Sequence, residues 1–172
     1  MELMIRPLSE ADLEGPAGLE ALRSSISGEL ANERGGPLFL ADRADRSTAS
    51  LIEGSAQGSS RCDIVLADGA LVGWAYTTIR HLVNGSSVAT IEEIAVDAQA
   101  RAIGAGEALL DATLAWCRAQ GCDGVDSFAL PGARETKNFF ETFGLKARLL
   151  TVHLNLRDEA AADPPAAEGT ES

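Results

Sequence analysis

Hydrophobic positions in the middle of the chain form short blocks that are separated by turn residues. Three of these blocks predict strands, at residues 62–67, 70–79 and 88–96. An Asp-Gly dipeptide at 68–69 lies between the first two blocks and an Asn-Gly dipeptide at 84–85 precedes the third, and both favour tight hairpin turns. The pattern therefore predicts an antiparallel meander of three strands.

The segments on either side predict helices and further strands. Residues 3–8 predict a strand that leads into a helical segment capped at Ser9, in which apolar residues recur as far as Ile26. Gly15-Pro16 must bend or restart this helix near its beginning. A helical stripe spans residues 104–120 and ends at Gly121. Between residues 28 and 60 the pattern is weak and predicts only a short helix at 47–53 before a flexible loop at 54–60. After the helical stripe the chain predicts a strand at 124–130, a short helix at 134–143 and a final strand at 146–156.

Composition assigns these elements to one domain. The chain has 172 residues, of which 45% are hydrophobic and 23% are charged, and this is enough apolar material for one core. Trp74 and Phe128 are expected in that core. Residues 158–172 differ, because they hold five acidic residues, no basic residue and a Pro-Pro pair. We therefore expect a domain at 1–157 and a disordered acidic tail at 158–172.

Charge and residue spacing exclude several classes of function. The net charge of -12 opposes binding to a polyanion, so nucleic acid is not an expected partner. The N-terminus lacks a signal-peptide pattern and no apolar run approaches the ~20 residues of a membrane span, so we expect a cytoplasmic protein that does not bind membranes. The three cysteines and two histidines lack ligand spacing, and no metal site is expected.

One segment carries a recognisable binding motif. Arg101-x-x-Gly104-x-Gly106 follows a predicted strand and opens a predicted helix. Glycine lets a ligand approach the backbone closely, and the helix N-terminus presents free N–H groups and the positive end of the helix dipole, which together suit a pyrophosphate. A dinucleotide-binding fingerprint does not fit, because its third small residue would fall on Leu109 and no β-α-β unit precedes it. A Walker loop does not fit either, because Gly-Lys-Ser/Thr is missing.

In and around this segment the sequence resembles the GNAT superfamily of acetyl-CoA-dependent N-acetyltransferases, over residues 3–156. Residues 101–106 are similar to the family's pyrophosphate loop, Gln/Arg-x-x-Gly-x-Gly/Ala, and the preceding strand carries the family-like Ile-Glu-Glu-Ile-Ala-Val at 91–96. Residues 136–145 are similar to the family's Ala-x-x-Phe-Tyr-x-x-x-Gly-Phe helix. The resemblance implies a GNAT fold of class α/β (α+β), whose mixed, mostly antiparallel sheet has about six to seven strands flanked by helices.

The resemblance also implies an activity. It implies transfer of an acetyl group from acetyl-CoA, the cosubstrate, to a primary amine of a small molecule or peptide by direct attack. The CoA pyrophosphate would lie on backbone N–H groups of the 101–106 loop, and the pantetheine arm along the strand edge at 94–96. A homodimer is a frequent arrangement in the family. The cofactor-binding residues expected on this basis are Ile94, Ala95, Val96, Arg101, Ala102, Ile103, Gly104, Ala105 and Gly106.

An attacking amine must be neutral, so a base has to take one of its protons. Glu92 and Glu93 are the candidates for this catalytic role. In a regular strand they point to opposite faces, so at most one faces the acceptor, and Glu92 is preferred because it shares its face with Ile94. In the alternative interpretation, one or both carboxylates only pair with Arg80 or Arg148 at a sheet edge.

Two positions depart from the family pattern. Phe140 stands where the family often has a tyrosine that protonates the departing thiolate, and Ala133 stands where it has an asparagine. The sequence does not place its single tyrosine, Tyr76, near the sulfur. These departures favour an alternative function, a CoA-binding GNAT-like domain with weak or no catalysis that acts through a protein partner. A nucleotide-binding protein unrelated to acyl transfer is a third hypothesis.

The acceptor is left open, and only the distribution of charge bears on it. Residues 1–100, which in such a fold supply much of the acceptor side, contain 15 acidic and seven basic residues, whereas residues 101–157 contain six acidic and seven basic residues. This excess of acid favours a cationic amine over an anionic acceptor, although charges more than ~10 Å apart are screened.

Overall fold

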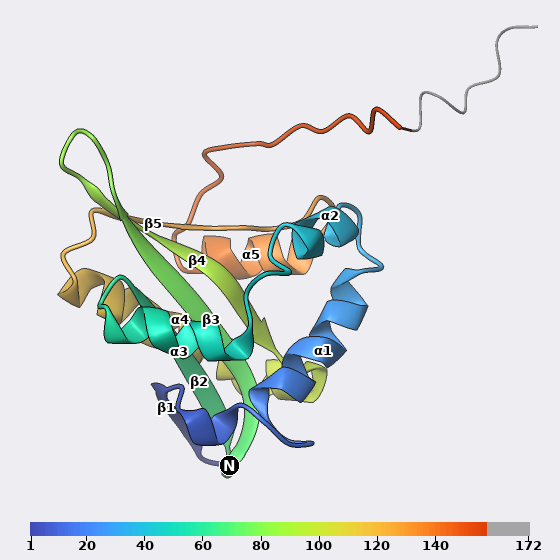
Figure 1. Cartoon of the computed structure of the whole chain (residues 1–172), viewed down its shortest axis with the longest axis vertical. Helices are drawn as coiled ribbons and strands as arrows, with labels where there is room; N and C mark the ends of the chain where they lie inside the picture. Colours follow the sequence, from blue (N-terminus) through green and yellow to red (C-terminus); the bar gives the residue numbers. More distant parts are fainter. Residues whose placement is uncertain (158–172) are drawn as a thin grey trace, which may run out of the picture.

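The computed structural model describes residues 1–157 and arranges them around one five-stranded sheet (Figure 1). The strands lie side by side in their sequence order; the first four are antiparallel to their neighbours, and the last pair is parallel. This mixed, mostly antiparallel sheet confirms the predicted fold class. The strands are β1 (Leu3–Pro7), β2 (Ser60–Ala67), β3 (Ala70–His81), β4 (Ser87–Val96) and β5 (Gly124–Ser127).

The predicted meander corresponds to β2, β3 and β4. Asp68 and Gly69, between β2 and β3, both have positive φ angles, 47° and 86°. A two-residue hairpin turn of type I′ requires positive φ at both central positions, and Asp-Gly tolerates it well. The turn chemistry therefore sets the register in which β2 pairs with β3.

Helices cover both faces of the sheet (Figure 1). Neighbouring residues of β2 point to opposite faces: Ile64 lies in a cluster with Leu19 and Leu51, whereas Val65 lies in a cluster with Leu109. Because both faces are covered, these strands consist of continuous apolar runs rather than alternating ones. The helices are α1 (Leu19–Leu30), α2 (Gly36–Ala41), α3 (Thr48–Ala56), α4 (Ala105–Ala119) and α5 (Arg134–Thr142), with short 3-10 turns η1 (Glu10–Asp12) and η2 (Ala98–Ile103).

The predicted number of strands is wrong for the described residues, which form five strands rather than six or seven. Residues 146–156 alternate as a strand would, but after α5 they run away from the sheet as an extended segment (Figure 1). The strand expected at 124–130 stops at Ser127. Alternation makes a strand only where an edge is available to pair with, and the segment that follows α5 does not reach one. Its large apolar side chains are exposed, namely Leu149, Leu150, Val152, Leu154 and Leu156.

The bend predicted at Gly15-Pro16 is confirmed: the helical segment from Ser9 stops after η1, the chain turns through Gly15, whose φ is 95°, and α1 begins at Leu19. The rest of the region up to residue 60 differs from its prediction. The helix α2 was not predicted, and α3 extends three residues beyond the predicted end at 53 into the expected loop. These short helices lie on the same side of the sheet as α1.

Four predictions concern membranes, the acidic tail, the oligomeric state and the location of the protein. Among residues 1–157 no helix is both long and apolar enough to cross a membrane. The acidic tail predicted at 158–172 lies outside the described residues. The homodimer and the cytoplasmic location stay predictions.

An ion pair between Arg6 of β1 and Asp12 of η1 anchors the first turn of the chain. The two guanidinium N–H donors lie 2.6 and 2.7 Å from the Asp12 oxygens, and Asp12 also forms a capping box with Ser9. The hydrogen bond from Arg6 is the main cause that holds the pKa of Asp12 below its usual value. Ionised Asp12 therefore stabilises the folded state.

We expect Asp12→Asn to lower the free energy of unfolding at pH 7 by about 1–2 kcal/mol, since it weakens a cap and an ion pair. Because the folded-state pKa is depressed, this stabilisation is complete above the unfolded-state value of about 4 and is lost as the pH falls towards the folded-state value. Urea unfolding from pH 7 to pH 3 should show the difference from wild type shrinking. Asp111→Asn, at an exposed position of α4, is the matched control; a difference that stays constant with pH would contradict the prediction.

Candidate active site

The strands β4 and β5 separate within the sheet. They pair from Val88–Gly124 to Ile91–Ser127, and β4 then continues to Val96 while β5 has ended. Beyond Ile91, the edge of β4 that faced β5 therefore has no strand partner among residues 1–157. A cleft of about 930 Å³ opens at this point, and it is lined by α1, α2, β4, the start of α4 and α5.

The N-terminus of α4 faces the same cleft. Gly104, with φ of 79°, is the left-handed residue that turns the chain from η2 into the helix, and Gly106 and Glu107 of the first turn line the cleft. The first N–H groups of a helix have no partner within it and carry the positive end of its dipole. An unpaired strand edge and a helix N-terminus thus converge on one space.

The predicted cofactor-binding residues divide into two groups. Those whose atoms line the cleft are Ile94, Ala95, Val96, Arg101 and Gly106. Those that do not line it are Ala102, Ile103, Gly104 and Ala105. The second group shapes the turn instead: Ala105 is fully buried and Ile103 packs against the same core cluster. The side chains of Ile103 and Ala105 therefore support the turn from inside the core.

The strand β4 contains a bulge at the two candidate bases. Tyr76 of β3 pairs with Glu93, and the next residue, Thr77, pairs with Ile91, so Glu92 is the extra residue. Both carboxylates line the same cleft. The expectation that they point to opposite faces is wrong, because the extra residue interrupts the two-residue period of a regular strand.

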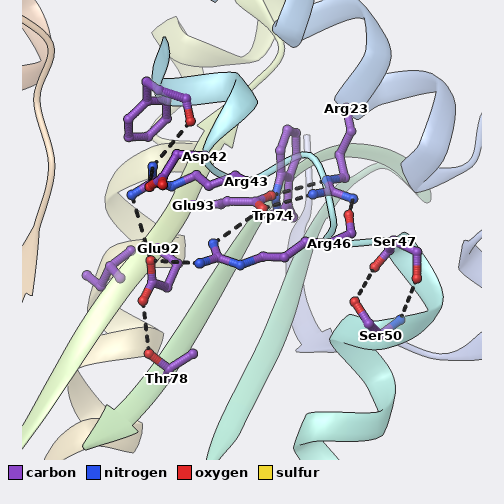
Figure 2. Close-up of polar contacts among 12 residues, drawn as sticks. Arg23, Asp42, Arg43, Arg46, Ser47, Ser50, Trp74, Thr78, Glu92 and Glu93 are labelled. Carbon is purple, nitrogen blue, oxygen red and sulfur yellow. Dashed lines mark hydrogen bonds and ion pairs between the residues drawn. The ribbon is translucent and has the colours of Figure 1, made fainter.

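The carboxylate of Glu93 is held by three hydrogen bonds (Figure 2). Arg23 of α1 donates from Nη2 to Oε1 at 2.8 Å and from Nε to Oε2 at 3.1 Å, and the indole Nε1 of Trp74 donates to Oε2 at 2.9 Å. The Glu93 side chain is only 12% exposed. Glu93 thereby joins α1, β3 and β4, and Trp74, a core residue as predicted, also serves as a polar partner in the cleft.

The carboxylate of Glu92 has fewer partners. Thr78 donates its hydroxyl to Oε1 at 3.2 Å, and Arg46 donates from Nη2 to Oε2 at 3.2 Å (Figure 2). Nη2 of Arg43 lies 3.9 Å from the same Oε2. A carboxylate has about four lone-pair sites, so Glu92 keeps more free acceptor capacity than Glu93.

The alternative pairing predicted for the two glutamates is wrong. Arg80 and Arg148 both contact Asp126 of β5 instead, with Arg80 at 3.2 Å. The hydrogen bond from Arg148 is the main cause that lowers the pKa of Asp126 below its usual value. Of the arginines that do reach the glutamates, Arg23 comes from α1, and Arg43 and Arg46 come from the weakly patterned segment at 28–60.

Arg43 is fixed by aromatic contacts that the sequence did not indicate. Its guanidinium carbon lies 3.8 Å from the ring centroid of Phe39 in α2 and 4.9 Å from that of Phe128, and Nη1 donates to the Phe39 carbonyl at 3.2 Å. Phe128 follows β5 and is 45% exposed, so its predicted place in the core is wrong. Cation–π contacts hold a guanidinium without using its N–H donors, which remain available to other acceptors.

The groups near the expected thiol position are mainly apolar. Phe140 is 6% exposed and lines the cleft beside Phe139. Tyr76 does not line the cleft, and its hydroxyl lies 3.6 Å from where a Cβ on Gly54 would be, on the side of α3. Tyr76 therefore does not substitute for the hydroxyl that Phe140 lacks. Ser127 does line the cleft, and its hydroxyl donates to the Ile91 carbonyl at 3.3 Å.

Nucleophilic or metal chemistry has no evident residues in this cleft. Cys62, Cys117 and Cys122 are free and none of them lines it. Burial raises the pKa of the Cys62 thiol and raises that of Cys117 to about 11, so neither is a ready thiolate at neutral pH. Within the described part of the chain, no group of three or more His, Cys, Asp or Glu residues is arranged to hold a metal ion.

Comparison with known protein families identifies the family of this chain. Residues 29–145, which contain the cleft-forming part of the sheet together with α4 and α5, match the Acetyltransferase (GNAT) family. The chain belongs to the GNAT acetyltransferase family. It is therefore an N-acetyltransferase of a family that uses acetyl-CoA as its cosubstrate.

Solved structures agree with the GNAT fold. An acetyltransferase from Trypanosoma brucei is 23% identical, with a TM-score of 0.63, and the match covers 90% of this chain and 100% of that chain. A glucosamine-6-phosphate N-acetyltransferase from Arabidopsis thaliana is 20% identical, with a TM-score of 0.65, over 91% of this chain and 99% of that chain. The comparison with curated proteins returns no significant match.

For this GNAT protein we expect Arg23→Gln to lower the free energy of unfolding by about 2–3 kcal/mol. That is somewhat below the value for breaking a fully buried ion pair, since Arg23 is 18% exposed. The variant removes two of the three donors to Glu93. The double variant Arg23→Gln/Glu93→Gln should regain part of the loss, because no unpaired carboxylate remains. Urea unfolding measures both variants.

Arg80→Gln is the matched control for this prediction. Arg80 is 54% exposed and pairs with Asp126 at the surface, so we expect its replacement to lower the free energy of unfolding by less than about 1 kcal/mol. Equal losses for Arg23→Gln and Arg80→Gln would contradict a structural role for the Arg23–Glu93 pair.

Proposed function

We propose that this acetyltransferase acetylates the primary amine of a small molecule or peptide by direct attack on acetyl-CoA, with Glu92 as the base. The observation that carries the proposal is the convergence of three features on one cleft: the unpaired edge of β4, the N-terminus of α4 and the bulged Glu92. Each supplies one requirement of the reaction, namely a surface for the pantetheine arm, donors for a pyrophosphate and an acceptor for a proton.

The donor side is suited to acetyl-CoA. A strand edge without a strand partner can hydrogen-bond an extended amide chain such as pantetheine, as a β-strand would. The free N–H groups at the start of α4 suit the pyrophosphate, and Gly106 brings the backbone close to it. Nearby, Arg101 bonds Glu29 of α1 at 2.9 Å, with both side chains about half exposed. Its guanidinium can therefore exchange this partner for a phosphate at little energetic cost.

On the side of the cleft where the amine would bind, Glu92 can take its proton. Nitrogen of the amine forms a bond to the acetyl carbon as the carbon–sulfur bond breaks, the electron pair leaves on sulfur, and one proton of the amine passes to Glu92. Glu92 is the better base of the two glutamates, because Glu93 accepts three hydrogen bonds and joins three elements, whereas Glu92 accepts two. An ordered water between amine and carboxylate serves equally well.

Isothermal titration of the protein with acetyl-CoA should show binding in the micromolar range. Gly106→Asp should weaken it at least tenfold, because it places a carboxylate where the pyrophosphate is expected. A carboxylate in the first turn of a helix stabilises the helix, so the loss should not come from unfolding. Ala115→Asp makes the same charge change on an exposed part of α4 away from the cleft and should bind normally. Equal affinity for both variants would contradict the proposed site.

Glu92→Gln should lower kcat/KM at neutral pH by roughly 10²–10⁴, the usual contribution of a general base. The rate should recover in part at high pH, where the amine is already neutral. Glu93→Gln should chiefly lower stability and leave the shape of the pH profile unchanged. Thiol release from acetyl-CoA across a panel of amines measures both variants.

The same assay separates the competing hypothesis. If acetyl-CoA binds but no amine is acetylated by the wild-type protein, the chain is the CoA-binding domain that Phe140 and Ala133 favour. A loss of rate for Glu93→Gln with recovery at high pH would assign the base to Glu93 instead.

A further inference from the structure

The partly buried charged groups at the β4 bulge are more positive than negative. Arg23, Arg43 and Arg46 line the cleft there together with Glu92 and Glu93, which leaves one guanidinium charge without a buried counterpart. The other acidic residues from this side of the cleft, Glu29 and Glu33, are exposed, so water screens them. Asp42 also contacts Arg43, at 3.3 Å, but its side chain is 76% exposed, so water screens this pair. The three arginines are only 12–26% exposed. A ligand that reaches this place therefore meets a positive site that is partly shielded from water.

Two N–H donors at this site lack a hydrogen-bond partner. They are Nε of Arg43 and Nη1 of Arg46, both buried and without an acceptor among residues 1–157. Nη1 of Arg46 lies 4.0 Å from Oε1 of Glu93, too far for a hydrogen bond. A buried donor left unpaired is destabilising, so an acceptor group supplied by a ligand would stabilise this arrangement.

We infer that the acceptor is an amino acid or similar amine that carries a carboxylate close to its amino group, and that Arg43 and Arg46 bind this carboxylate. The inference rests on the proposed function, in which Glu92 takes the proton of the amine. Nη2 of Arg46 lies 3.2 Å from Oε2 of Glu92 and Nη2 of Arg43 lies 3.9 Å from it (Figure 2). Because the two recognition points are neighbours, amine and carboxylate must be separated by only one or two carbon atoms.

Charge favours a carboxylate over a phosphate. One guanidinium charge is unbalanced, and a carboxylate brings one negative charge, whereas a phosphate monoester brings up to about two at neutral pH. A guanidinium also matches the two oxygens of a carboxylate in geometry. The wall beside the two arginines is apolar, with Phe39, Leu40 and Phe128, and this favours an amino acid whose own side chain is apolar.

The test compares leucine with leucinamide and isopentylamine, which keep the amine and the apolar side chain but lack the carboxylate. With acetyl-CoA and thiol detection, we expect kcat/KM for leucine to exceed that for leucinamide at least tenfold. The ammonium group of leucinamide is the more acidic of the two, so its amine is more often neutral and a preference for leucine cannot come from amine basicity. Arg43→Gln and Arg46→Gln should each bring the ratio towards one.

Controls keep the loss of the carboxylate site apart from unfolding. Arg80→Gln, at the exposed pair with Asp126, should retain the leucine preference. Arg46→Lys keeps the charge but loses the fork of donors, so its ratio should fall between wild type and Arg46→Gln. Thermal melting of each variant identifies any that no longer folds, and the ratio of two substrates on one folded variant does not depend on the amount of active protein.

Each alternative outcome has one meaning. Equal rates with leucine, leucinamide and isopentylamine would overturn the inference and leave the proposed acetyl transfer intact. Acetylation of phosphoethanolamine in preference to every amino acid would overturn the choice of carboxylate. Binding of acetyl-CoA without acetylation of any of the twenty amino acids would also overturn it. Failure to bind acetyl-CoA is a separate result, which contradicts the proposed function itself.

Discussion

The cleft depends on one extra residue in β4. A regular strand would point Glu92 and Glu93 to opposite faces, but the bulge directs both into the same space. Two carboxylates side by side and shielded from water repel one another and need cationic partners. Arg23, Arg43 and Arg46 supply these cations. Because they come from α1 and from the chain between α2 and α3, the packing of these segments against the sheet also neutralises the charge at the bulge. Binding geometry and local stability share the same contacts.

The proposed acetyl-CoA side of the cleft has a different structural origin, which is the partial pairing of β4 with β5. Because β5 pairs with only the first half of β4, the second half of β4 presents an open edge, and the chain leaves that edge directly into η2 and α4. The helix N-terminus is therefore adjacent to the open edge in both sequence and space. Gly104 makes this possible, since its left-handed conformation turns the chain sharply into α4. The donor site is thus a property of the backbone, whereas the acceptor site is built from side chains.

This difference explains what could be predicted from the sequence. The meander, α4, α5 and the 101–106 loop follow from turn dipeptides, helical periodicity and glycine positions, all of which act locally. The partners of Glu92 and Glu93 could not be predicted, because Arg43 and Arg46 lie in a segment with little periodicity and reach β4 from more than 40 residues away. A bulge likewise leaves no local signature, since Ile-Glu-Glu-Ile suits a regular strand equally well. The final strand was predicted from alternation alone, which says nothing about whether an edge is available.

On the side of the cleft where the acceptor would bind, the position of each charge matters more than the total charge of the sequence. Residues 1–100 contain more than twice as many acidic as basic residues, and on that basis a cationic acceptor was expected. Yet three of their seven basic residues lie partly buried around the two bulge carboxylates, whereas Glu29 and Glu33, which also line the cleft, are exposed. Electrostatic attraction between exposed charges fades beyond ~10 Å, but partly buried groups a few ångströms from a ligand are screened far less. The nearest groups therefore outweigh the total charge, and for this reason the acceptor that we propose carries its own negative charge.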